Sequence, residues 1–113
     1  MTRAFLTVLS WLVLVVPASA LSNEERRAQV TDFLAEAIAI DSVCDAVQVH
    51  MEYLWITLQQ AKINLDELLP EAGAKSASYM PEFAEVGPQE VCRRGAEYYG
   101  PRGTKFPNML TLQ

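Results

Sequence analysis

Apolar side chains recur every three or four positions between residues 30 and 58, the spacing that places them on one face of an α-helix. On a helical wheel they all fall within about 80° of Cys44, which stands in the middle of the row. The pattern predicts an amphipathic stripe that faces a core. The stripe consists of Val30, Phe33, Leu34, Ala37, Ile40, Cys44, Val47, Met51, Leu54, Trp55 and Leu58.

The stripe is expected to divide into two helical segments. Ser22 and Glu25 stand at capping-box spacing, so the first segment should begin near Asn23. One helix from there to Lys62 would be about 58 Å long, whereas a compact domain of this size has a radius of gyration of about 12 Å. We expect the break at residues 41 and 42, where a serine and a following aspartate repeat the capping-box spacing.

A second apolar row lies on the opposite side of the second segment. Val49, Tyr53 and Ile56 follow one another at steps that form a continuous ridge on a helix. A helix that is apolar on two sides has to be covered on two sides. Either the chain's own Phe83 and C-terminal tail cover this ridge, or a second copy covers it in a homodimer, and both alternatives stay open.

Turn-forming residues divide the next part of the chain into short pieces. Asn64 should cap a helix, and Pro70 and Gly73 are expected to cut that helix short. Residues 81–86 have the pattern of a short helical piece, which Gly87 closes.

The last helix has the clearest boundaries. Pro88 occupies a first-turn position and Gly100 stands just beyond the end of the segment, which is the usual asymmetry of helix termini. Gly95 lies three residues after Cys92 on the same face, where the missing side chain allows another helix to approach closely. The sequence therefore predicts tight helix packing at Gly95.

The C-terminal tail carries more apolar side chains than a free end needs. Because of Phe106, Met109 and Leu110, we expect much of the tail to pack on the domain, with a docking peptide for a partner as the alternative. Arg93 and Arg94 form a further candidate interaction site, although neighbours on a helix diverge by about 100°. Surface ion pairs with the acidic body of the protein are the simpler interpretation of these arginines.

The N-terminus has the pattern of an export signal. Arg3 provides a positive charge, residues 4–16 are mostly apolar, and Ala18-Ser19-Ala20 has the form of a signal-peptidase site. The apolar run is shorter than the stretch of about 20 residues that spans a bilayer. We expect cleavage after Ala20, which leaves residues 21–113 as one helical domain in the periplasm or outside the cell, with no stable membrane insertion.

Cys44 and Cys92 are the only cysteines of the chain and lie 48 positions apart, so they do not form a C-x-x-C redox pair. Cysteine pairs of exported proteins usually oxidise, because the compartment that receives them is oxidising. The sequence therefore predicts a structural disulfide that fastens the last helix onto the apolar stripe.

Removal of residues 1–20 leaves 8 basic and 14 acidic side chains, a formal charge of −6. This balance argues against nucleic acid as a partner and disfavours an anionic membrane surface. The charge is uneven, because residues 91–113 carry +3 and residues 21–90 carry −9. We expect the basic end to dock on the acidic body of the same molecule, with a partner-binding patch as the alternative.

The sequence contains none of the common catalytic or cofactor-binding motifs. The one histidine, His50, and the nearby Glu52 point about 160° apart on a helix, so they do not converge. A single small domain also leaves little room for a deep cleft. We therefore expect no cofactor, no metal site and no enzymatic activity.

Short motifs spread over residues 24–112 carry a resemblance to other proteins. In these motifs the chain resembles a family of small exported two-cysteine helical proteins of unknown function from alphaproteobacteria. It departs from the family by a shorter middle helical section, with Pro70 and Pro81 inserted. The resemblance implies no particular activity. The motifs are Cys44-Asp45, Glu52-Tyr53-Leu54-Trp55, Cys92-Arg93-Arg94-Gly95 with Glu97, Gly103-Thr104 and Met109-Leu110.

The sequence as a whole predicts an all-α fold, a small multi-helix bundle stapled by one disulfide. Two classes of function remain. The first is a non-catalytic protein of the cell envelope that binds another protein or itself. The second is a small periplasmic acid-stress chaperone that exposes apolar surface on protonation, since the chain resembles such chaperones in size, export, helicity and a single disulfide.

Overall fold

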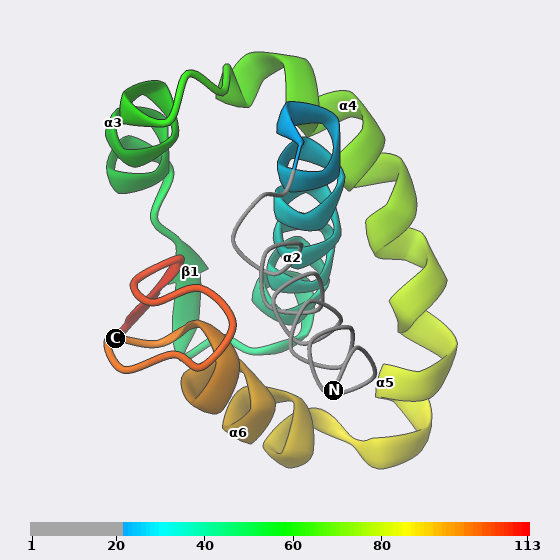
Figure 1. Ribbon diagram of the computed structural model, residues 1–113. Coiled ribbons are helices and arrows are strands. Elements are labelled where there is room, and N and C mark those ends of the chain that lie inside the picture. The colour runs from blue at the N-terminus through cyan, green and yellow to red at the C-terminus, as the bar shows by residue number, and fades with distance from the viewer. Residues whose placement is uncertain (1–21) are drawn as a thin grey trace, which may run out of the picture.

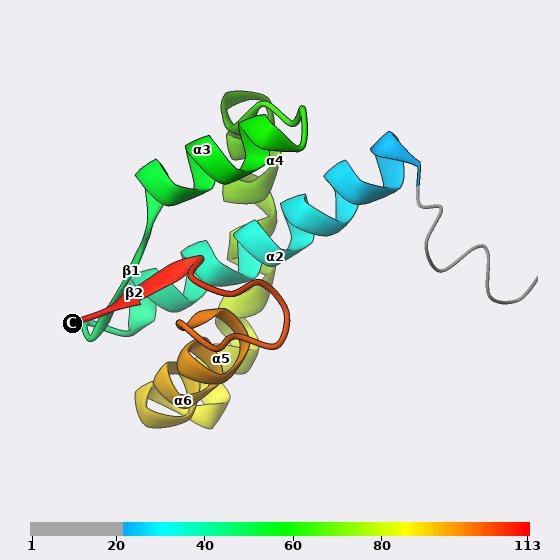
Figure 2. The ribbon, with the colours of Figure 1, turned by 60° about the vertical axis from the view of Figure 1, so that its left-hand side comes forward.

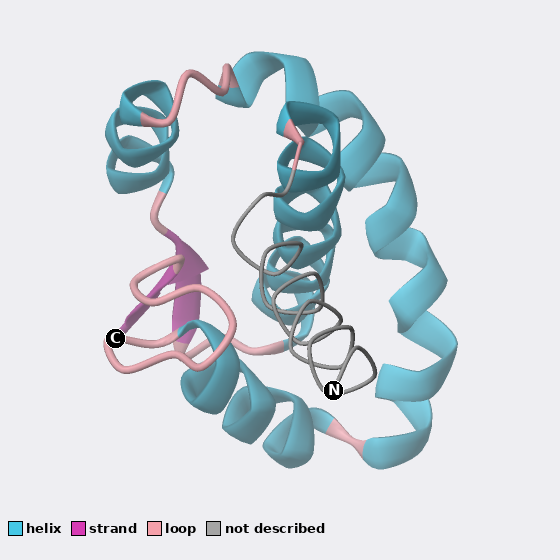
Figure 3. Ribbon diagram, in the orientation of Figure 1, coloured by secondary structure: helices cyan, strands magenta, loops and turns pink. Residues whose placement is uncertain are grey.

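The computed structural model describes residues 22–113, and the predicted signal peptide, residues 1–20, lies outside the described residues. The described part is mostly helical and carries one short two-stranded sheet (Figures 1 and 3). This confirms the predicted helical fold class. The elements in chain order are α2 (Asn23–Val43), β1 (Val47–Val49), α3 (Met51–Gln60), α4 (Leu65–Ser76), the 3₁₀ turn η1 (Ala77–Tyr79), α5 (Met80–Val86), α6 (Pro88–Tyr99) and β2 (Leu110–Leu112).

Helix α2 is the longest element of the described chain, and the others are arranged around it (Figure 2). It begins at Asn23 as predicted, because the Ser22 hydroxyl accepts a hydrogen bond from the Glu25 N–H at 3.1 Å. Helix α4 packs along one side of α2, and α6 packs on another side. The sheet and the C-terminal loop cover the region beside α6 (Figure 1).

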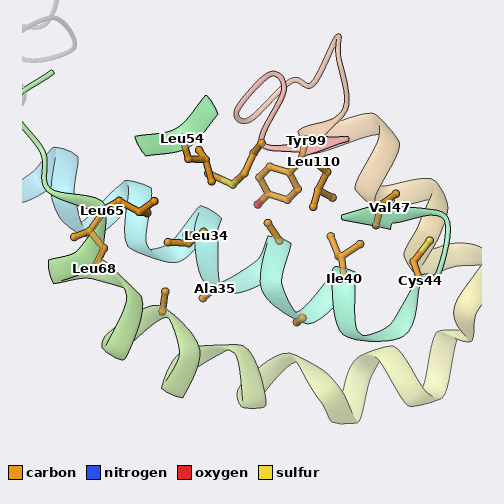
Figure 4. Close-up of a cluster of buried hydrophobic side chains, with 14 of the residues drawn as sticks. Leu34, Ala35, Ile40, Cys44, Val47, Leu54, Leu65, Leu68, Tyr99 and Leu110 are labelled. Atoms are coloured by element: carbon orange, nitrogen blue, oxygen red, sulfur yellow. The ribbon is translucent and has the colours of Figure 1, made fainter. Parts of the chain in front are cut away.

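The core lies on both flanks of α2. Leu34 and Ile40 point toward Tyr99 of α6 and Leu110 of β2, and Ala35 points the opposite way, toward α4 (Figure 4). All five side chains are buried. The predicted stripe of α2 is therefore covered by the C-terminal part of the chain, and α4 covers a second face that the stripe did not include.

Cys44 and Cys92 form a disulfide with a Cα–Cα distance of 5.3 Å, as predicted. The bond joins the C-terminal end of α2 to the first half of α6. One turn further along α6, a Cβ atom on Gly95 would lie 2.8 Å from Cγ2 of Ile40 and 3.3 Å from Cδ1 of Leu110. The absence of a side chain at Gly95 therefore permits the close approach of α6 to α2 and β2 that the sequence indicated.

The predicted break at residues 41 and 42 is misplaced, because α2 continues through both residues and ends at Val43. The Ser42 hydroxyl donates to the Ala39 carbonyl at 2.7 Å instead of capping a new helix. The Asp41 carboxylate accepts the backbone N–H of Val49 at 2.9 Å and so fastens β1 beside the end of α2.

Residues 44–50 were predicted to be helical and are not. They form a turn and strand β1, which pairs antiparallel with β2 so that Val47 lies opposite Leu112. The prediction failed because Val47 fits the helical spacing from Cys44 to Met51 as well as it fits the alternation of a strand. A three-residue strand is too short for its pattern to override that spacing.

Helix α4 also departs from the expectation. It starts after Asn64, whose side chain accepts the Asp66 N–H at 3.0 Å, but it runs through Pro70 and Gly73 to Ser76. Leu65, Leu68 and Ala72 of α4 are buried, and the packing on α2 offsets the hydrogen bond that a proline removes. The two later helices follow the prediction, with α5 closed by Gly87 and α6 bounded by Pro88 and Gly100.

Removal of the disulfide should destabilise the fold strongly. In the chain-entropy model, a bond that closes 48 positions of sequence stabilises the folded state by about 4 kcal/mol. A double variant, Cys44→Ser with Cys92→Ser, should lose most of this free energy of unfolding in urea titrations. The reduced wild-type protein should match the variant, and an unchanged unfolding midpoint in both would contradict the structural role of the bond.

Candidate interaction surface on helix α3

Helix α3 is held to the domain by few side chains. Leu54 and Leu58 are its only buried residues, and they occupy one side of the helix. Figure 1 shows α3 at the edge of the molecule, apart from α2. The remaining sides of α3 therefore face outward.

Large apolar side chains nevertheless continue around the outer sides of α3. Met51, Trp55 and Ile56 are 41%, 47% and 50% exposed, and each is among the most exposed large apolar residues of the described chain. Met51 and Trp55 lie one turn apart in one row, and Glu52 and Ile56 lie one turn apart in the adjacent row. These four residues form a contiguous patch, which we call the α3 surface.

An open pocket adjoins the α3 surface. It has a volume of about 280 Å³ and lies between the C-terminal end of α3 and the start of α4. Trp55 and Gln59 form one wall, and residues 62–66 form the other. Its lining combines the apolar side chains of Trp55, Ile63 and Leu65 with the charged side chains of Lys62 and Asp66.

The predicted ridge of Val49, Tyr53 and Ile56 does not exist as one helical row. Val49 belongs to strand β1, where its N–H is bound by Asp41. Tyr53 is half-buried and stacks on His50 with ring centroids 5.4 Å apart. Of the three residues, Ile56 alone lies on the α3 surface.

The predicted candidates in the C-terminal tail are part of the core. Met109 and Leu110 are 0% and 1% exposed, and Phe106 is partly buried against the same cluster. The Met109 carbonyl accepts the His50 N–H at 2.9 Å, which ties the tail to the start of α3. The tail therefore packs on the domain, as we expected.

Arg93 and Arg94 are engaged in ion pairs rather than presented to a ligand. Both contact Glu90 on their own helix, and Arg94 also reaches Glu82 of α5 at 3.2 Å. Hydrogen bonds from Arg93, and then from Arg94, lower the pKa of Glu90 to about 2. The surface-ion-pair interpretation of the two arginines is thus correct, since Glu82 and Glu90 belong to the acidic body, and Arg93 also pairs with Glu97 of its own helix.

A buried polar cluster joins α2 to the C-terminal part of the chain. The Tyr99 hydroxyl donates a hydrogen bond to the Glu36 carboxylate, and Lys105 Nζ lies 2.9 Å from the same carboxylate oxygen. Glu36 is 8% exposed, and the Lys105 ammonium also lies 4.3 Å from the centre of the Tyr98 ring. This ion pair docks the basic end of the chain on its acidic body, as the charge distribution predicted.

Burial, followed by the hydrogen bond to Glu36, raises the pKa of Tyr99 above its ordinary value. Burial likewise raises the pKa of Tyr79, with the Glu36 charge as the next cause. Every buried side-chain nitrogen and oxygen of residues 22–113 has a hydrogen-bond partner. The cluster is therefore a fully satisfied polar contact inside the core.

The sequence prediction missed both features that matter most here. Met51 and Trp55 were assigned to the buried stripe, because the helical spacing continues across residues 44–50. Glu36 was not singled out, although it stands among the buried residues Ala35 and Ala37. Its place at the margin of the apolar stripe is the signal that could have identified it.

The chain matches no protein-family model, no curated protein and no solved structure. Among the described residues, no helix has both the length and the apolar character that crossing a membrane requires. Within residues 22–113, no three His, Cys, Asp or Glu side chains gather as a set of metal ligands.

Tyr99→Phe should lower the free energy of unfolding at neutral pH by about 1 to 2 kcal/mol, because the buried Glu36 loses one of its two partners. It should also remove an alkaline loss of stability. With a raised folded-state pKa, Tyr99 ionises first in the unfolded chain, so wild-type stability falls as pH rises above about 10.

Melting midpoints measured between about pH 9 and pH 11 would check this dependence. The slope should flatten in Tyr99→Phe and persist in Tyr53→Phe, whose hydroxyl lies outside the cluster. Equal slopes in all three proteins would show that Tyr99 does not control the alkaline limb.

Proposed function

We propose that this protein is an exported, non-catalytic helical protein of the cell envelope that binds another protein, or a second copy of itself, through the α3 surface. The observation that carries the proposal is the exposure of Met51, Trp55 and Ile56 on one ten-residue helix. Methionine and aromatic residues are enriched in protein interfaces, and tryptophan is among the residues enriched at binding hot spots. Contiguous apolar patches on a protein surface mark interaction sites.

Two further features support export and a binding role. The disulfide is compatible with an oxidising compartment beyond the cytoplasm. The N-terminal pattern of a charged residue, an apolar run and a small-residue site supports passage to that compartment. A binding protein of this kind needs a rigid frame, which α2, α4 and α6 provide around the buried core.

Site-specific photo-crosslinking in the host cells would test the proposal. A photoreactive side chain at position 59 lies one helical turn from Trp55 and leaves the α3 surface intact. It should give a crosslinked adduct in the cell envelope fraction, and the adduct should disappear when Trp55→Lys is added. Because Trp55 is half-exposed, this variant should keep the melting midpoint of the wild type.

The matched control carries the photoreactive side chain at position 85, an exposed site on α5 far along the chain. Position 85 should give no adduct. The proposal is wrong if position 59 also gives none, or if its adduct survives the Trp55→Lys substitution.

A second candidate function is an acid-stress chaperone, and the buried Glu36 cluster favours it. Glu36 receives Tyr99 from α6 and Lys105 from the loop that follows. Tyr79 of η1 and Asp32 of α2 are the other titratable groups on this side, and Lys75 of α4 pairs with Asp32 at 2.9 Å. Protonation of carboxylates would remove these ion pairs and leave the chain strongly positive, which loosens a fold by self-repulsion.

A chaperone of this kind should bind an apolar dye and suppress aggregation of a client protein below about pH 3, where carboxylates are protonated. Glu36→Gln, which cannot pair with the Lys105 ammonium, should shift both responses toward neutral pH. The control Glu85→Gln removes an exposed carboxylate and should shift neither. Absence of client protection by the wild type at low pH would exclude this function.

A further inference from the structure

The α3 surface contains one acidic residue, Glu52, and a basic residue, Lys62, lies just beyond the opposite end of α3. Glu52 lies in the first turn of α3, and Lys62 lies two residues after Gln60, the last residue of the helix, in the turn that leads to α4. Among the described residues, neither side chain forms an ion pair. The two charges thus flank Trp55 and Ile56 with no partner of their own within this part of the chain.

The two charges are arranged so that the surfaces of two copies are complementary to each other. A two-fold axis places each residue of one copy against the same residue set of the other in reverse order. If two α3 helices pack antiparallel across such an axis, Glu52 of each copy faces Lys62 of the other, and two equivalent ion pairs form. A parallel arrangement would instead bring like charges together, which is unfavourable.

The apolar groups fit the same arrangement. Met51 at the start of α3 would face the end of the other helix, where the pocket of about 280 Å³ lies beside Trp55 and Gln59. Trp55 and Ile56, near the middle of the helix, would meet their counterparts close to the axis. Antiparallel helix dipoles add a favourable term, because the positive end of each helix lies by the negative end of the other.

We infer that the partner of the α3 surface is the α3 surface of a second copy of this chain, packed antiparallel across a two-fold axis. The inference rests on the proposed function of this surface and names its occupant. Residues 21–90 carry a formal charge of −9, yet α3 contributes only Glu52 to it. The α3 helices themselves therefore add little mutual repulsion, and Asp66 of the pocket is the carboxylate that Glu52 of the other copy approaches beside Lys62. Interfaces built on one short helix lie at the small end of the size range, so the dimer dissociates on dilution.

The test measures mass by light scattering and sedimentation over about a hundredfold range of concentration, with the exported protein purified from the cell envelope. The wild type should pass from monomer to dimer within that range. Glu52→Lys and Lys62→Glu should each weaken the dimer by about tenfold or more, because each reversal turns two attractions into two repulsions. The double variant should restore wild-type association, and Glu85→Lys should leave it unchanged.

Tryptophan emission gives an independent readout, since Trp55 is the only tryptophan of residues 22–113. Its emission should shift to the blue as the dimer forms and should stay red at all concentrations in Glu52→Lys. The melting midpoint of each diluted variant, compared with that of the diluted wild type, shows whether a substitution acts through folding. An additional variant, Ile56→Lys, lies opposite the buried face of α3 and tests the same surface without touching either charge.

The possible outcomes separate the two proposals. A monomer at every concentration, together with a crosslinked adduct of another protein at position 59, would overturn the dimer and leave the binding function standing. A monomer with no adduct would overturn both. If the charge reversals and Ile56→Lys leave the dimer unchanged, the dimer forms elsewhere on the molecule. If the double variant does not restore association, the two helices pack in a different register. Either result refutes the inference.

Discussion

The disulfide between Cys44 and Cys92 is the constraint on which the rest of the fold depends. It fixes α6 at the end of α2, and the direction of α6 then brings Tyr99 over the middle of α2, where it meets Glu36. The chain continues from there into the loop that carries Lys105 and into β2, which pairs with β1 just beyond Cys44. One covalent bond thus sets the register of an ion pair, a hydrogen bond and a strand pairing.

Local signals that depend on a single residue type were reliable predictors of this fold. The serine cap at Ser22, the Pro88 start and the Gly100 stop each act through the backbone of their own helix, and no tertiary contact opposes them here. The disulfide was predictable because the described chain offers one possible pairing. Pro70 misled the prediction, since its cost to α4 is offset by burial on α2, which no local pattern reveals.

The candidate site was less predictable than the fold, for a geometric reason. Helical phase accumulates along a continuous helix, and the non-helical stretch 44–50 resets it. After the reset, Met51 and Trp55 no longer continue the buried side of α2, and Leu54 and Leu58 alone remain in the core. A helical pattern that is extended across an unrecognised break therefore assigns some exposed apolar residues to the core. A contact such as the one between Glu36 and Lys105 exists only in the folded chain, so no local sequence pattern predicts it.

The completion of the core by Met109 and Leu110 has a consequence for the order in which the protein forms. These fully buried side chains lie within the last five residues of the 113-residue sequence, and Val47 pairs with Leu112 across the sheet. The side of α2 that these residues cover therefore stays exposed in any intermediate in which residues 109–112 have not yet docked. Contacts between segments this far apart in the sequence are expected to form late in folding, because a long loop has to close before they can form.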